Sequence, residues 1–210
     1  MALLSTLLDR VHDELPAVPE PVALRFLSDS FKEFCTRTHA WQEELPAVRV
    51  RAERTQFELS PDTGTMVAAI KEVRLESGEL VPAAPAELSR ILTTRPSTSA
   101  KPLAWFQTRP DIFEVVNASE EDVRLSVLAA LTLVQSYTEY DLPEILLSEW
   151  GENIAAGAKG RLLVQPNQPW SAPELAPEFR RQFYVAVNQA KARAMTSLGA
   201  AQLQVQMRSW

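Results

Sequence analysis

The sequence is poor in the residues that covalent cross-links and metal sites require. Cys35 is the single cysteine, so the chain cannot form an internal disulfide or a zinc site with four thiolate ligands. The two histidines, His12 and His39, lack the spacing of a zinc-binding helix. A chain of 210 residues can bury about 70% of its unfolded surface and needs neither device to fold. We therefore expect no metal and no cofactor.

The sequence also lacks long apolar runs and a basic start. Asp9 and Arg10 interrupt the first apolar residues, and no positive side chain precedes them, so no secretion signal is predicted. The longest uncharged stretch, residues 125–138, is shorter than the about 20 residues that a membrane-spanning helix requires. The pattern predicts a protein without a membrane partner.

Motifs that carry chemistry are missing as well. Residues 157–161 (GAKGR) resemble a phosphate-binding loop, but the required spacing of glycine, lysine and serine or threonine is absent. The acidic clusters at residues 43–44 and 120–122 consist of adjacent charges beside predicted turns, which are solvated far more often than catalytic. Cys35 lies on an apolar helix, where a buried thiol is the usual outcome. The sequence therefore predicts a protein that is not an enzyme.

Charge is unevenly distributed along the chain. Residues 179–210 contain five basic residues and no acidic residue; because the whole chain carries −6, the remaining residues carry −11. This asymmetry indicates an acidic body and a basic end that can meet in neighbouring copies. Overall acidity argues against a dedicated nucleic-acid-binding protein. We expect a partner-binding patch at Arg180, Arg181, Lys191 and Arg193.

The spacing of apolar residues divides the chain into four parts. Residues 1–44 have helical spacing in two stretches separated by prolines, as in the first part of a helical body. In residues 45–140 the period shortens to two, with turn signals between short runs, as in an inserted β domain. Residues 141–198 return to helical spacing and form the second part of the helical body. Residues 199–210 alternate again and are predicted to form an extended arm.

Several short strands are expected in the β domain. The clearest strand candidates are residues 48–52, 65–76, 103–107, 112–116 and 123–133. A short helix at 86–92 and a loop at 93–102 are expected between the second and third of these strands. A hairpin is predicted at Ser77-Gly78. About six short strands in one block imply a small antiparallel sandwich or barrel.

The second helical part contains a run of small residues that includes Gly151, Ala155 and Ala158. Glycine weakens a helix by about 1 kcal/mol relative to alanine, so we expect a close approach to another helix. Capping boxes are predicted at residues 141–144 and 171–174, the second opening a helix that runs to about residue 198 and is capped by Gly199.

The predicted arm carries apolar residues without a local partner strand. Leu203, Val205 and Met207 alternate with glutamines, and Trp210 ends the chain. An exposed aromatic anchor commonly marks a partner interface, so these four residues are predicted to bind a partner. The predicted fold is α+β: a helical bundle formed by both chain ends, with an inserted small antiparallel β-sandwich or barrel and an extended C-terminal arm.

Laid out in this order, the chain resembles the head-to-tail adaptor (head-completion or connector) proteins of tailed bacteriophages. The resemblance rests on four stretches: residues 31–41 (FKEFCTRTHAW), 73–80 (VRLESGEL), 142–163, and 169–175 (PWSAPEL) with the basic helix that follows. In that family these stretches correspond to a helix running into a strand, a β hairpin, a helix of small residues and the last helix.

The resemblance implies a structural virion protein in the head–tail neck, assembled in the host cytoplasm. It implies a homo-oligomeric ring of twelve copies that binds the portal protein, extends the DNA channel and offers a platform for tail or nozzle proteins. DNA would pass through the channel without specific binding. Alternatives are another neck component, such as a tail-tube or terminator protein, and, from a different class, a small hydrolase or ligand-binding domain.

Overall fold

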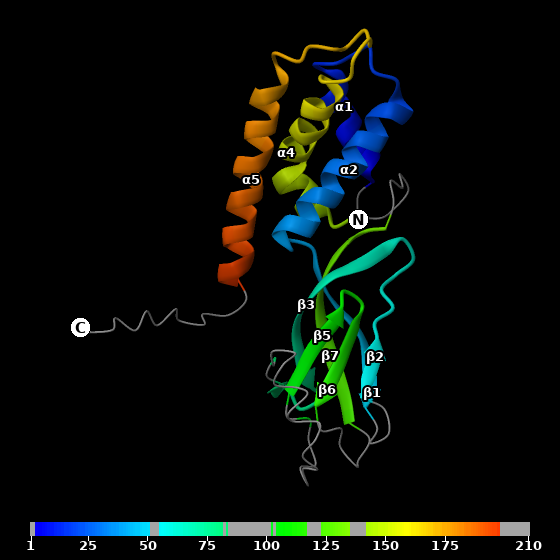
Figure 1. Ribbon diagram of the computed structural model, residues 1–210, viewed down its shortest axis with the longest axis vertical. Coiled ribbons are helices and arrows are strands. Elements are labelled where there is room, and N and C mark those ends of the chain that lie inside the picture. The colour runs from blue at the N-terminus through cyan, green and yellow to red at the C-terminus, as the bar shows by residue number, and fades with distance from the viewer. Residues whose placement is uncertain are drawn as a thin grey trace, which may run out of the picture.

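The computed structural model describes residues 3–50, 55–81, 83, 102, 104–116, 123–134 and 142–197. Within them the fold is mixed α+β, with two antiparallel sheets and no closed barrel, as the coarse fold prediction required. Figure 1 shows the helices gathered at one end of an elongated molecule and the strands at the other. The predicted helix at 86–92, the predicted loop at 93–102 apart from Pro102, the cap at Gly199 and the arm at 199–210 lie outside the described residues.

The helices come from both ends of the chain. In chain order they are the 3₁₀ turn η1 (Leu4–Leu7), α1 (Leu8–His12), α2 (Glu20–Thr38), α4 (Glu144–Leu162) and α5 (Ala176–Ser197). Helix α4 packs against α1, α2 and α5, so it has neighbours on several sides. A helix in such a position buries most of its surface, and residues 154–160 of α4 are all buried.

The boundaries of α2 follow from its sequence. Pro19 precedes the helix and Pro21 lies in its first turn, where a missing backbone N–H does no harm. Leu27, Phe31 and Phe34 recur at helical spacing and are fully buried. The helix ends at His39, whose backbone adopts the left-handed conformation with φ of 53°.

The first sheet has the strand order β1 (Gln42–Val50), β7 (Val123–Leu133), β3 (Thr65–Leu75) and β4 (Leu80–Val81). The predicted hairpin at Ser77-Gly78 is confirmed, with Gly78 at a φ of 83°. Strand β1 lies at an edge, and its register shifts between Leu45 and Val48. This interval contains Pro46, which has no N–H to donate and is tolerated at an edge.

The second sheet has the order β2 (Gln56–Glu58), β6 (Ile112–Val116) and β5 (Ala104–Arg109). Phe57 of β2 and Phe113 of β6 are register partners, and their ring centroids lie 5.5 Å apart. Both rings belong to the same buried cluster as Phe34 of α2 and Val127 of β7. The helices and the two sheets therefore share one apolar core.

The close helix approach predicted from the small residues is confirmed. A Cβ added to Gly157 would lie 2.6 Å from Cδ2 of Phe183 on α5, closer than van der Waals contact allows. At the end of this seam, Arg180 Nε donates to the carbonyl of Gly160 at 3.3 Å. The absence of a side chain at Gly157 is what brings α5 this close to α4.

The first predicted capping box depends on Asp141, which lies outside the described residues. Helix α4 begins at Glu144 with Pro143 at its N-cap and no side-chain capping hydrogen bond. Residues 173–175 form a turn and α5 begins only at Ala176, so the predicted box at 171–174 does not open this helix. Pro177 lies in the first turn of α5, where its missing N–H does no harm, whereas in a helix begun at residue 172 its ring would clash with the carbonyl of Pro173.

Candidate functional site

The four basic residues predicted to form one patch all lie on α5 but point in different directions. Two of them are paired with carboxylates of the same chain. Arg181 Nη2 donates to Glu178 Oε1 at 2.7 Å on the exposed side of the helix, and this hydrogen bond lowers the pKa of Glu178. Arg193 forms an ion pair with Glu149 of α4. Arg180, as described above, is held at the α4–α5 seam. Arg193 and its partner Glu149 line a pocket of about 260 Å³, whereas Lys191 lines a larger groove.

The other four predicted partner-binding residues, Leu203, Val205, Met207 and Trp210, lie outside the described residues. Their role as apolar anchors stays a prediction.

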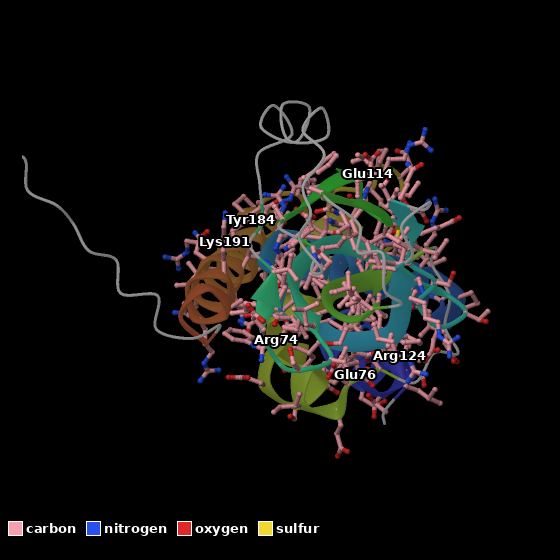
Figure 2. All side chains as sticks on the ribbon, turned by 90° about the horizontal axis from the view of Figure 1, so that it is seen from below. Arg74, Glu76, Glu114, Arg124, Tyr184 and Lys191 are labelled. Atoms are coloured by element: carbon pink, nitrogen blue, oxygen red, sulfur yellow. The ribbon has the colours of Figure 1, made fainter. Side chains whose placement is uncertain are left out.

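Lys191 belongs to a groove where the end of α2, strand β3 and the second half of α5 meet. The groove has a volume of about 550 Å³ and is lined by Thr36, Arg37, Thr38, His39, Lys71, Lys191 and Ala194. We refer to it as the cationic groove. Figure 2 shows Lys191 beside Tyr184 on α5, consistent with a separation of seven residues, or two helical turns.

The end of α2 contributes Arg37 and His39 to the groove, and β3 and α5 contribute one lysine each. His39 is the C-cap residue of α2 and has left-handed backbone geometry. Lys71 projects from β3, and its Nζ donates to His39 Nδ1 at 2.6 Å. In neutral His39 the proton must then reside on Nε2, which leaves that nitrogen as a donor.

Burial and like charge shift the ionisation of these groups. The pKa of His39 is lowered, first by burial and then by the positive charges of Lys71 and Lys191. Burial also lowers the pKa of Lys71. Burial therefore opposes the charged form of both groups, and neighbouring positive charge opposes it further at His39.

The lining of the cationic groove contains no aspartate or glutamate among the described residues. Arg37 is already engaged, because its Nε donates to Glu33 Oε1 at 2.7 Å and its guanidinium lies 5.4 Å from the centre of the Tyr184 ring. Across residues 3–50, 55–81 and the later described segments, no carboxylate is within ion-pairing distance of Lys71 or Lys191. The groove can therefore accept an anion from outside.

Sequence reasoning identified Lys191 and missed the other members of the groove. Arg37, His39, Lys71 and Lys191 are spread over more than 150 positions, so no local motif joins them. The signal that existed was the absence of a nearby acid around Lys191, and it pointed to α5 alone.

The described residues also bear on three other features: a metal site, a membrane-spanning helix and a reactive cysteine. In these segments no group of three or more His, Cys, Asp or Glu side chains gathers as a metal site would. No described helix is both long enough and apolar enough to traverse a lipid bilayer. Cys35 is fully buried, as predicted, and burial raises the pKa of its thiol. A buried, protonated thiol is a poor nucleophile.

Comparison with known proteins gives no assignment. No protein-family model matches the chain. No curated protein matches it either.

Proposed function

We propose that this chain is a structural virion protein of a tailed bacteriophage, forming the adaptor ring between portal and tail. The observation that carries the proposal is the order of the elements. Helices from both chain ends gather around α4, while the intervening chain forms antiparallel sheets. The described elements follow the order of the stretches on which the resemblance rests; the inserted β-sandwich and the extended arm are part of the proposal.

A ring of identical copies needs heterologous contacts, in which one patch fits a different patch on the next copy. The helical end offers apolar side chains for such contacts. Ile145 on the first turn of α4 is 71% exposed, and Val185 on α5 is 50% exposed. Leu175 and Tyr184 add exposed apolar area on and just before α5. Contacts at several places on the helical end would suit a ring, in which each copy has a neighbour on either side.

In the proposed virion neck, twelve copies surround the DNA channel below the portal and present a platform for tail or nozzle proteins. The chain carries a net charge of −6, which suits a channel wall that repels phosphates and lets the genome slide. The ring would assemble onto the portal in the host cytoplasm.

The test is to mix the purified chain with its cognate portal ring and measure the mass of the product by mass photometry. A product heavier than the portal by about twelve chains supports the proposal. Matched lysine substitutions at Val185 and at Leu80, which is 56% exposed on β4, locate the contact. Val185→Lys should weaken attachment and Leu80→Lys should not. A chain that does not bind the portal but polymerises into tubes would be a tail-tube protein. A chain that neither binds the portal nor polymerises would refute the proposal.

A further inference from the structure

The cationic groove holds charges that the described part of the chain does not neutralise. Lys71 and Lys191 reach it from β3 and α5, and His39 lies at the end of α2. We propose that this groove is a receptor for carboxylates of a second copy of the chain. Only the choice of occupant rests on the proposed ring; the anion-binding property rests on the groove itself.

The first argument is electrostatic. Like charges gathered in a half-buried place repel each other, and an anion placed among them replaces this repulsion by attraction. The effect is larger in a partly enclosed groove than on an open surface, because less water screens the charges. The structure thus contains positive groups arranged around a space of about 550 Å³, which is within the usual size of a ligand site.

The second argument is the set of donors. Lys71 Nζ spends one N–H on His39 Nδ1 and keeps two others. His39 contributes Nε2–H in its neutral form, and Lys191 contributes an exposed ammonium group. Donors on three different elements can surround an oxyanion from several sides, whereas the hydroxyl groups of Thr36 and Thr38 already donate to backbone carbonyls of α2.

Carboxylates of a second copy fit the groove better than nucleic-acid phosphates do. A nucleic acid carries its negative charge along its whole length and would meet a chain of net charge −6. A neighbouring copy in a ring is held by other contacts and needs to supply only a few carboxylates. The chain has 27 acidic residues, and its longest uninterrupted acidic run is Glu120-Glu121-Asp122.

The binding experiment uses a synthetic peptide with the sequence of residues 117–123 as the probe for these carboxylates. The control peptide replaces the three acids with glutamine, glutamine and asparagine. Fluorescence anisotropy should show binding of the acidic peptide that weakens with salt, and little binding of the control. Lys71→Gln should weaken binding about fivefold, because it removes one partly exposed ion pair. Lys191→Glu should weaken it about tenfold, because charge reversal adds repulsion. Arg109→Glu, at an exposed position of β5 and with the same change of charge as Lys191→Glu, should leave binding unchanged.

A direct readout locates the peptide. The groups that line the groove with His39 are Arg37 on α2, Lys71 on β3 and Lys191 on α5. A bound carboxylate should shift the NMR signal of the His39 ring and raise the pKa of His39 towards its ordinary value. Circular dichroism of each variant shows whether it is folded. Glutamine is chosen at position 71 because it keeps part of the apolar stem of the lysine side chain.

Each outcome decides the inference. Equal binding of the acidic and control peptides would overturn the inference. Undiminished binding of the acidic peptide by both Lys191→Glu and Lys71→Gln would overturn it too. Tighter binding of a 12-nucleotide oligo-dT, displaced by inorganic phosphate, would replace the carboxylate with a phosphate ligand. If the chain attaches to portal while the groove variants assemble normally and bind no peptide, the groove inference fails and the adaptor survives. If the groove binds the peptide but the chain does not attach to portal, the anion-binding groove stands and the adaptor proposal fails.

Discussion

Replacing Gly157 with alanine tests how closely α4 and α5 approach. The new Cβ would lie 2.6 Å from Cδ2 of Phe183 and 3.0 Å from two further ring atoms. The ring of Phe183 is buried and packs near Phe34 of α2, with centroids 6.4 Å apart. It therefore cannot move away without disturbing a second helix. The backbone of Gly157 has no positive φ, so alanine introduces no strain of its own.

Two effects of opposite sign determine the free energy of unfolding of Gly157→Ala. Alanine favours the helix by about 1 kcal/mol over glycine. Overpacking a well-filled core costs about 1–3 kcal/mol. We expect the clash to win, because the nearest atoms belong to an aromatic ring and not to the end of a flexible chain. The net change should be a loss of about 1 kcal/mol, and Gly157→Leu should lose more.

The assay is urea unfolding followed by far-UV circular dichroism, with the m-values compared to verify that the same surface is exposed. The control is the same substitution in a Phe183→Leu background, which removes the ring. There Gly157→Ala should be neutral or stabilising, and the difference between the two backgrounds gives the coupling energy. If Gly157→Ala alone raises the free energy of unfolding by about 1 kcal/mol, helix propensity is the sole effect and the tight seam is refuted.

Three further predictions follow from the structure. The side chain of Lys159 is 2% exposed, and its Nζ lies 2.6 Å from Glu14 Oε1. Lys159→Met should change the free energy of unfolding by less than about 1.5 kcal/mol in the urea assay. Glu14→Ala should cost more, because it leaves the buried cation with the Glu152 carboxylate at 3.6 Å. Burial and neighbouring lysines lower the pKa of His39 below its ordinary 6.5, so the unfolded chain binds more protons. The free energy of unfolding should therefore fall as the pH is lowered below 6.5, and His39→Gln should make this fall shallower. An equal slope in the original chain and the variant would contradict the prediction. Deleting residues 199–210 should leave the melting temperature unchanged but abolish portal attachment by mass photometry, and normal attachment would show that the arm is dispensable.

Elements with a strong local period were predictable from the sequence. The bounds of β6 and β7 match the prediction, since each is a run of β-branched and apolar residues between polar segments. The prediction that one face of β7 is apolar holds along the strand, but Ala130 and Thr132 on the other face are buried too. Helix α2 covers that end, where Thr132 Oγ1 donates to the carbonyl of Lys32 at 3.2 Å. Burial by an element distant in sequence leaves no periodic signal.

Charge was harder to interpret than periodicity. The sequence showed that basic residues cluster after residue 178, but not which of them are already paired. Glu178 and Glu149 neutralise Arg181 and Arg193, the first from the same helix and the second from α4. Only the packing of α5 against α4 determines the second pair. A linear count of charges therefore located the helix and could not identify the groove.

The α4–α5 seam and the cationic groove are mechanically connected. Phe183 lies between Gly157 and Phe34, so its ring sets the distance of α5 from both α4 and α2. Lys191 follows Phe183 by eight residues on the same rigid helix, and it faces His39 at the end of α2. A helix transmits a displacement at one turn to the next turns, because its backbone hydrogen bonds fix their relative positions. The close approach at Gly157 is thus one of the contacts that fix the position of α5, and with it the position of Lys191. We therefore expect substitutions in this seam to affect the proposed contact between copies as well as stability.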